Sequence, residues 1–491
     1  MERVIAETDF ISLLLSHQAE ATDDQRKILE HPRRNNLSTI VRIKGLAGSG
    51  KTLCLLAKLL QEAVQIPPDA PDTEENALLF VCFNREMAHY AANLLKPFPE
   101  AKRIRVTTFD SLVYQMLMPT YNNKRKPVCS DVAFPAGENW KLDYTHQFTA
   151  QAMEIVGERY PQHKGAFFVD THGKAADKNI AWMNDELCWL EAHYLTEQEA
   201  RLHYPAAPRI GRGGVHKPRK DVRPVILEVW HEQRKLLAQE KRFTLEQAVN
   251  RLLKSRELPR FSMIAVDEAQ DLATRSIELL LAMRENMDTR VYMAVDENQR
   301  IYQRDFSWKQ LGVHRRATTY SLARNLRSNS AVHAFAMRCQ GIVNNTAPKS
   351  ECVQLVRGGE KEVLDLAVNL AAQPNRTTLL VGGPDWDAKL LARGVAVRNP
   401  MTKISATAEG RVRDEVDISK PGLYVMGELK CKGLEFDNVL VPSLACGADA
   451  PEDARRRRYV HFTRARHNLY VVTGPRVPTW AKDAYGDLLS A

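Results

Sequence analysis

The chain has 491 residues, of which 44% are hydrophobic and 26% charged, an ordinary composition for a globular protein with room for two to four domains. No apolar run approaches the roughly 18–20 residues of a membrane-spanning helix, and the N-terminus lacks the apolar segment of a signal peptide. The net charge of +9 is consistent with a nucleic-acid partner without requiring one. The eight cysteines include no C-x-x-C pair, which indicates reduced thiols of a cytoplasmic protein rather than a zinc site or a disulfide framework.

Strand and helix patterns alternate over residues 1–118. Apolar, β-branched runs predict strands at 38–43, 77–83 and 103–107. Helical periodicity predicts helices at 22–30, 53–63, 85–95 and 109–117. Because strands that alternate with helices pair in parallel, we predict an α/β domain with a parallel sheet.

The pattern changes near residue 118. Strand-like runs become rare over 119–260, and we predict helices at 144–160, 184–193, 196–203 and 225–240. Alternation then returns, with strands predicted at 263–266, 291–295, 377–381, 423–426, 439–441 and 469–472. We therefore predict two α/β domains, the first formed by 1–118 and 261–315 and the second by 316–491, with 119–260 as a mostly helical insertion in the first.

A glycine-rich loop at 45–52, GLAGSGKT, fits G-x-x-x-x-G-K-[ST], the loop that binds phosphates. Its glycines allow a tight turn in which successive N–H groups face one anion, beside the positive end of the following helix. Lys51 is expected to reach the β- and γ-phosphates, and the Thr52 hydroxyl to bind Mg²⁺. The predicted nucleotide-binding residues of this loop are Gly45, Gly48, Ser49, Gly50, Lys51 and Thr52.

An acidic motif, DEAQD at 267–271, directly follows the predicted strand 263–266. Asp267 stands where a carboxylate can hold Mg²⁺ through water, and Glu268 can polarise the attacking water. Together with the glycine-rich loop, this motif predicts a magnesium-dependent enzyme that hydrolyses a nucleoside triphosphate.

Seven further motifs lie before, between and after these two, in chain order TDDQR (22–26), FVCFNREMA (80–88), VTTFDSL (106–112), AVDENQRIY (294–302), NLRS (325–328), KGLEFD (432–437) and YVHFTRAR (459–466). With the two motifs above, this ordered set resembles the UvrD/Rep/PcrA type of superfamily 1A helicase. The resemblance implies two RecA-like P-loop NTPase domains, 1A (1–118 and 261–315) and 2A (316–491), with 119–260 as a 1B-type insertion. Only a short insertion, near 385–421, fits where family members carry a large 2B subdomain.

The resemblance also implies roles at an ATP cleft. Gln25 would hydrogen-bond the adenine, Glu435 the ribose, and Gln299 would sense the γ-phosphate. Arg327 and Arg464 would act from the second domain, Arg464 as an arginine finger that stabilises the transferring phosphoryl group. The catalytic residues so implied are Lys51, Asp267, Glu268, Gln299, Arg327 and Arg464.

The resemblance implies that a single strand of nucleic acid runs past several of these motifs and that Tyr302 stacks on its bases. The contacts it implies are Phe83, Asn84, Thr108, Phe109, Tyr302 and Lys432. Trp308 is either a second stacking platform or a core residue. A loop that contains Arg209, Arg212, Lys217, Arg219, Lys220 and Arg223 is suited equally to phosphate contact and to solubility.

The chain departs from the family pattern at two adenine-clamp positions. Leu53 and Leu326 stand where the family usually has an arginine and a tyrosine, so the clamp is apolar and the preference for ATP is open. The segment before Lys432 lacks the usual threonine and histidine that contact DNA phosphates, which weakens the expectation of DNA contact more than that of hydrolysis.

Two functions stay open, both with ATP and Mg²⁺ as cofactors. The first is an ATP-dependent 3′→5′ DNA helicase or translocase on single-stranded or tailed DNA, as in DNA repair, with RNA not excluded. The second is a nucleic-acid-sensing ATPase subunit that regulates a partner supplying a nuclease or loading function, for example in anti-phage defence. Intact Lys51, Glu268, Gln299 and Arg464 argue against a binding module without turnover.

Overall fold

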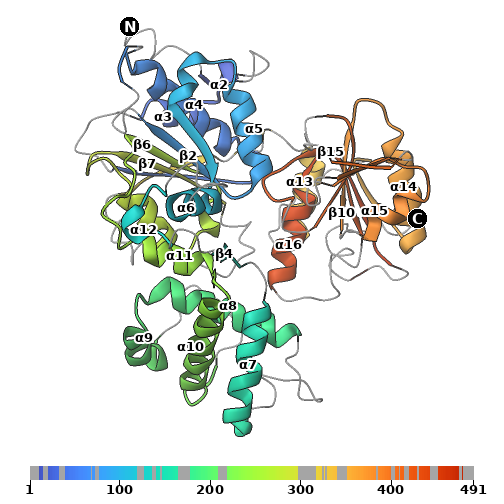
Figure 1. The fold of residues 1–491 in the computed structure, drawn as a ribbon. Coiled ribbons are helices and arrows are strands. Elements are labelled where there is room, and N and C mark those ends of the chain that lie inside the picture. Colours follow the sequence, from blue (N-terminus) through green and yellow to red (C-terminus); the bar gives the residue numbers. More distant parts are fainter. Residues whose placement is uncertain are drawn as a thin grey trace.

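The structure is a computed structural model that describes most of the chain. The described residues are 10–14, 20–31, 39–67, 69–71, 77–118, 127–134, 140–143, 146–163, 177–207, 218–296, 317–322, 324, 326, 329–339, 351–382, 385–399, 404–407, 410–413, 420–427, 431–442, 452–474 and 478. They form two α/β units and a helical lobe that extends from the first unit (Figure 1). None of the described helices combines the length and apolarity needed to cross a membrane.

The first unit contains a six-stranded sheet in which every pairing is parallel. Its order is β3 (Ile104–Thr108), β2 (Leu78–Cys82), β6 (Met263–Val266), β7 (Arg290–Val295), β1 (Ile40–Gly45), β8 (Ala317–Leu322). The residues of β2, β6 and β7 are buried throughout, as expected for parallel strands that are covered on both faces. The predicted parallel α/β architecture is therefore confirmed.

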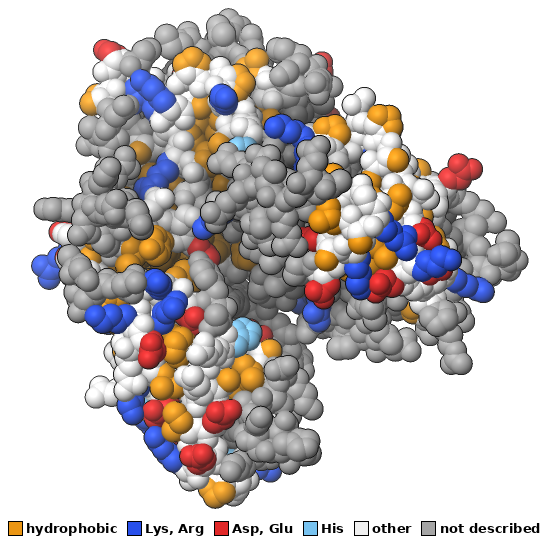
Figure 2. Space-filling model, turned by 45° about the vertical axis from the view of Figure 1, so that its right-hand side comes forward, with side chains coloured by type: hydrophobic (Ala, Val, Ile, Leu, Met, Phe, Trp, Pro, Cys, Tyr) orange, Lys and Arg blue, Asp and Glu red, His pale blue; other side chains and the backbone are white. Residues whose placement is uncertain are grey.

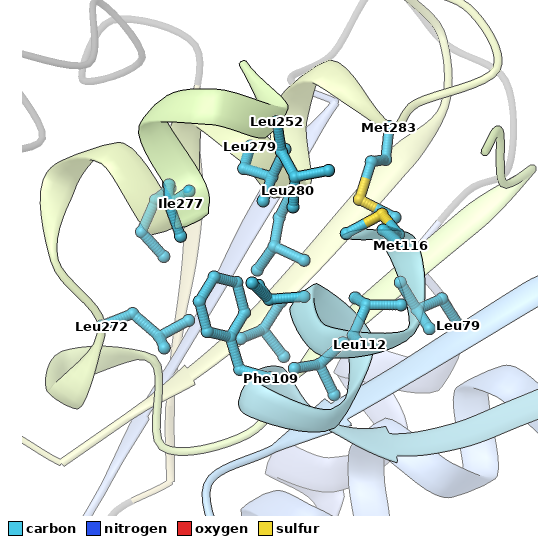
Figure 3. Packing of buried hydrophobic residues seen from close by; sticks show 14 of the residues in the cluster. Leu79, Phe109, Leu112, Met116, Leu252, Leu272, Ile277, Leu279, Leu280 and Met283 are labelled. Carbon is cyan, nitrogen blue, oxygen red and sulfur yellow. The ribbon is translucent and has the colours of Figure 1, made fainter. Parts of the chain in front are cut away.

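Helices cover both faces of this sheet (Figure 1). One face packs against α2 (Phe10–Leu14), α3 (Asp23–Leu29), α4 (Lys51–Gln65) and α5 (Arg85–Leu95). The other packs against α6 (Phe109–Leu117), α11 (Leu245–Leu252) and α12 (Thr274–Ala282). Side chains from α6, α11 and α12 meet above the sheet, and Figure 3 shows Phe109 among Leu272, Ile277 and Leu280.

The boundary predicted at residue 316 is wrong, because β8 belongs to the first sheet. Its residues 317–322 pair in parallel with β1 from Ile40 to Gly45. A hydrogen bond of 2.8 Å between His31 Nδ1 and the Tyr320 hydroxyl also ties β8 to the segment after α3. The ammonium of Lys58, on α4, donates to the carbonyls of Leu29 and His31 at 2.8 and 3.0 Å. The first unit thus extends at least to residue 322.

The helical lobe has a core of its own. It contains α7 (Gln147–Arg159), α8 (Asp177–His193), α9 (Glu197–His203) and α10 (Arg223–Gln239), whose buried side chains lie between Ala152 and Trp230. Both ends of the predicted range 119–260 pack instead into the first unit, including β5 (Arg242–Phe243), which pairs with β4 (Lys141–Leu142), and α11. The independent lobe is therefore shorter than the predicted insertion.

The second unit contains an eight-stranded sheet. Its order is β13 (Gly410–Arg413), β12 (Ile404–Thr407), β11 (Val397–Asn399), β14 (Gly422–Met426), β10 (Thr377–Val381), β15 (Phe436–Pro442), β16 (Ala465–Val472), β9 (Val353–Val356). Helices α13 (Ser330–Cys339) and α16 (Glu452–Phe462) cover one face, and α14 (Glu360–Ala371) and α15 (Asp385–Leu391) the other. The described part of 385–421, a range predicted as a short insertion, forms α15 and the antiparallel strands β11, β12 and β13 at the sheet edge.

Phe109 offers a test of the core of the first unit. Its ring is 2% exposed, and removing it should lower the free energy of unfolding by about 3–5 kcal/mol. Tyr114, on the same helix, is 42% exposed, and Tyr114→Ala should change stability by less than about 0.5 kcal/mol. Denaturant unfolding of Phe109→Ala and Tyr114→Ala measures both effects, and similar losses for the two variants would contradict the packing.

His31 predicts a dependence of stability on pH. Burial, aided by the charges of Arg290 and Lys58, lowers the pKa of His31 from 6.5 to about 4. The unfolded chain binds this proton as the pH falls below 6.5, whereas the folded chain does so only near pH 4, so stability is lost across that window. The variant His31→Asn should reduce the drop in melting temperature between pH 7 and pH 5, while exposed His146→Asn should leave it unchanged. An unaltered drop in His31→Asn would refute the assignment.

Candidate active site

The glycine-rich loop lies at the carboxyl end of β1, between this strand and α4. Gly48 and Gly50 have φ angles of 75° and 83°, a left-handed conformation that favours glycine. At Gly45, a Cβ atom would lie 2.4 Å from the Ser49 hydroxyl oxygen, so a larger residue does not fit without a shift. The loop therefore turns tightly enough for its N–H groups to face one anion, as the motif predicts.

Lys51 is held over this loop. Its ammonium donates to the carbonyl oxygens of Gly45 and Leu46, both at 2.9 Å, and lies 3.7 Å from the Asp296 carboxylate. Asp296 follows β7 and is 1% exposed. No role was predicted for Asp296, although an acidic residue directly after a buried strand, at the same sheet edge as Asp267, is a usable signal.

Thr52 and Asp267 meet at the start of α4. The Thr52 hydroxyl donates to an Asp267 carboxylate oxygen at 2.6 Å, and both side chains are buried. Burial and the neighbouring Glu268 raise the pKa of Asp267 to about 6, although Thr52 and Lys51 oppose this shift. A hydroxyl and a carboxylate at this separation are the hard oxygen ligands that Mg²⁺ takes together with nucleotide phosphates, so the donor set fits that ion.

Glu268 adopts a strained backbone conformation. Its φ of 51° and ψ of 39° lie in the left-handed region, which non-glycine residues seldom adopt and which recurs at functional sites. Its carboxylate accepts a hydrogen bond from the Gln270 side-chain amide, whose oxygen accepts from the N–H of Asp296 at 3.0 Å. Although burial opposes it, attraction by Lys432, Lys51 and Arg464 lowers the pKa of Glu268, which keeps the carboxylate ionised for use as a base.

Two cations of the second unit lie at this site, Lys432 in contact with carboxylates of the first unit and Arg464 in the same cavity as Glu268. The Lys432 ammonium donates to Asp271 at 2.5 Å and lies 3.9 Å from Glu268, and it is 1% exposed. The Arg464 guanidinium donates to the carbonyls of Val460 and Leu434 at 2.8 and 3.1 Å. Its second terminal nitrogen donates to the Thr463 hydroxyl at 3.1 Å, so Arg464 is held by its own unit and fixed in orientation before it meets a ligand.

One cavity joins the loop to both units. It is lined by residues 47–52, Met87 and Glu268 from the first unit and by Gly433, Glu435 and Arg464 from the second. Leu326 borders the loop, because its N–H donates to the carbonyl of Gly48 at 2.9 Å, and its side chain is 51% exposed. Leu53, on α4, is partly buried.

Gln25 lies behind the loop. Its amide nitrogen donates to the Ser49 carbonyl at 3.3 Å, and its oxygen accepts from the Thr22 N–H at 2.9 Å in a capping box at the start of α3. The side chain is 1% exposed, so its contact with adenine remains a prediction. The predicted residues Gln299, Arg327 and Tyr302 lie outside the described part of the chain, as do Trp308, Arg209, Arg212 and Lys217.

Several residues predicted to contact nucleic acid have other roles. The Phe109 assignment is wrong, because the ring is part of the core shown in Figure 3. The Lys432 ammonium is buried against Asp271 and Glu268 in this structure, and its contact with nucleic acid stays a prediction. Asn84 and Thr108 cap α5 and α6 and are 9% and 4% exposed. Among the predicted contacts that the structure describes, only Phe83, directly after β2, is partly exposed.

Asn84 and Lys432 also join the two units directly. The side-chain amide nitrogen of Asn84 donates to the backbone carbonyl of Lys432 at 2.6 Å, while its oxygen accepts from the N–H of Met87. The cap of α5 is therefore fixed to the segment that carries Lys432 into the site. The sequence indicates the helix cap, because Asn84 directly precedes the predicted helix 85–95. It does not indicate the contact between Asn84 and Lys432.

These features define a two-domain P-loop NTPase, with the phosphate loop on one sheet and cations supplied by the other unit. The family model of the UvrD/REP helicase N-terminal domain matches residues 21–307, and that of the UvrD-like helicase C-terminal domain matches 423–472. Because the first match covers more than half of the chain, the chain belongs to the UvrD/REP helicase family. No curated protein matches it. The family's domains imply an ATP-hydrolysing DNA helicase.

The buried pair between Lys432 and Asp271 can be tested by a double-mutant cycle. Lys432→Met leaves two buried carboxylates without their cation and should lower stability by about 3–5 kcal/mol. Adding Asp271→Asn should recover part of this loss, because one uncompensated charge is then removed. Denaturant unfolding gives the coupling energy.

The control for this cycle is Arg376→Gln. Arg376 is 45% exposed and lies 3.8 Å from Asp437, so breaking this pair should change stability by less than about 1 kcal/mol. Strictly additive effects of the Lys432 and Asp271 substitutions would show that the two side chains are not coupled.

Proposed function

We propose that the chain is an ATP-dependent 3′→5′ DNA helicase or translocase. The observation that carries the proposal is the arrival of Lys432 and Arg464, both from the second unit, at the carboxylates and phosphate loop of the first. A nucleotide bound between the units would touch both, so its hydrolysis would change the contacts that hold them together. The 3′→5′ polarity rests on family resemblance.

Each catalytic role follows from the chemistry of the side chain. Lys51 would transfer its hydrogen bonds from the loop carbonyls to the β- and γ-phosphates. Thr52 and Asp267 would hold Mg²⁺, which neutralises charge on the phosphates when bound. Glu268 would orient the attacking water and accept its proton, and Arg464 would stabilise the charge that develops on the phosphoryl oxygens. Roles for Gln299, Arg327 and Gln25 stay part of the proposal.

Coupling to DNA would run through the contacts between the units. Asn84 caps α5 and binds the backbone of Lys432, so a shift of the second unit would pull on the carboxyl end of β2, where Phe83 lies. Phe83 and Tyr302 are the proposed stacking contacts with single-stranded DNA. Figure 2 shows acidic and basic side chains interspersed on the lobe at the bottom, so on this face the described residues favour a local strand contact over a broad basic surface.

A second candidate function is an ATPase subunit that senses DNA and controls a partner such as a nuclease. The observation that favours it is that the described part of residues 385–421 forms α15 and edge strands of the second sheet rather than a separate subdomain. In this role the units would close on DNA and ATP without separating strands. The seven described cysteines are free thiols, which supports the proposed cytoplasmic setting for either function.

The deciding measurement is ATP hydrolysis by the purified chain with and without single-stranded DNA. We expect DNA to stimulate turnover, and Glu268→Gln to lower it about 10²–10⁴-fold while ATP still binds. Removal of Mg²⁺ by chelation should abolish turnover. A duplex with a 3′ tail should then be unwound and one with a 5′ tail should not.

Other outcomes would separate the candidates. Turnover stimulated by DNA without unwinding of either duplex would favour the sensing subunit. Retained hydrolysis in Lys51→Ala would refute the assigned site altogether.

A further inference from the structure

A second cavity lies where the helical lobe joins the first α/β unit. Its volume is about 500 Å³, within the range of small-molecule sites. Its walls come from residues 131–134, Trp140, α8, α10, β5 and α11. It shares no lining residue with the cavity between the two units that contains the glycine-rich loop, so a ligand here would be separate from the hydrolysed nucleotide.

One wall of this cavity is an aromatic stack. The Phe134 ring lies between Trp140 and Phe243, with centroids 4.6 and 4.5 Å apart and rings nearly parallel at 23° and 22°. Phe134 and Phe243 are buried, whereas Trp140 is only partly buried. The Arg251 guanidinium lies 4.6 Å from the Phe134 centroid and, by donating to the carbonyls of Val132 and Ala133, fixes this segment. The result is a rigid apolar surface suited to a planar ring.

The cavity also contains two cations that pair with none of the described residues. Arg242 and Lys254 line it, and neither side chain makes a hydrogen bond or ion pair with any residue that the structure describes. Arg242 is partly buried and Lys254 is exposed, so both ends are open to a ligand. The groups that best match a guanidinium are carboxylates and phosphates, which bind its fork of donors in a bidentate manner.

The two acidic residues of the cavity do not pair with these two cations. The buried Glu191 carboxylate accepts hydrogen bonds from Trp230 at 2.9 Å and from Gln247 at 3.3 Å, and lies 3.5 Å from Arg234. Asp131 accepts from the Ser255 hydroxyl and from the Arg256 N–H, at 2.6 and 2.7 Å. Asp131 keeps its negative charge, because its donors are neutral, but the lining also contains Arg234, Arg242, Arg251 and Lys254, so the net charge of the lining is positive.

We propose that this cavity binds a nucleoside phosphate, with its base against Trp140, the partly buried member of the stack, and its phosphate on Arg242 and Lys254. The aromatic wall and these two cations each match one half of such a molecule. The ligand is either a free nucleotide or the terminal nucleotide of a nucleic-acid strand, because both present a base and a phosphate. The proposed contacts all belong to the first unit, and the opposite side of the cavity is formed by α8 and α10 of the lobe, so a bound ligand would also lie against the lobe.

The test is calorimetric binding of deoxyadenosine monophosphate to the full chain carrying Lys51→Ala, which weakens the ATP site. We expect one binding site, and a loss of affinity of about tenfold or more when Arg242→Gln and Lys254→Gln are added. The matched control is Arg256→Gln, two residues from Lys254 and outside the cavity lining, which should change affinity less than about twofold. In the chain with native Lys51, Arg242→Gln and Lys254→Gln should leave basal ATP hydrolysis unchanged.

Short oligonucleotides with a 5′- or 3′-terminal phosphate distinguish the two sources of the ligand. Binding of an oligonucleotide but not of the monophosphate, with the same dependence on Arg242 and Lys254, would assign the cavity to a strand end. Comparable binding of the monophosphate would assign it to a free nucleotide. Affinity that does not respond to Arg242→Gln and Lys254→Gln, or inorganic phosphate binding as tightly as the monophosphate, would overturn the proposal.

Discussion

A buried lysine sets the relation between the two α/β units. Lys432 belongs to the second unit, yet its ammonium is enclosed by Asp271 and Glu268 of the first. Charges removed from water are costly unless they are paired, so each of these groups requires the others. Separation of the units would break the pair and hydrate all three side chains. The pair therefore favours a narrow set of interdomain positions, and these bring Arg464 and Glu268 to the same cavity.

The same interaction depends on the backbone at Glu268. This residue is separated from β6 only by Asp267 and takes its left-handed conformation where the chain leaves the sheet. Gln270 holds it from the other side by bridging the Glu268 carboxylate and the backbone of Asp296 at the end of β7. Two adjacent strands thus determine the position of one carboxylate. Local strain of this kind persists only where surrounding contacts fix it, and here the contacts come from β7 and from the second unit.

The parts of this fold that the sequence predicted well are those with one dominant physical signal. The strands at 263–266 and 377–381 were predicted with their observed bounds because they are buried along their whole length. The helix at 85–95 was likewise predicted correctly, since Asn84 supplies its cap. Strand β8, with the sequence ATTYSL, was missed because it lies at a sheet edge and is mostly polar and half-exposed. Long-range pairing with β1 decides its structure, and periodicity does not report that.

In the site, too, some features can be predicted from a few adjacent residues, whereas others depend on contacts that only the folded chain makes. The glycine-rich loop, Thr52, Asp267 and Glu268 were predictable because each motif carries its own chemistry over a few adjacent residues. The burial of Lys432 was not, because its partners lie about 160 residues away and belong to the other unit. A lysine beside a glycine looks suited to phosphate contact in any exposed segment. Here the fold converts it into an internal cation, which tunes the carboxylate that would activate water.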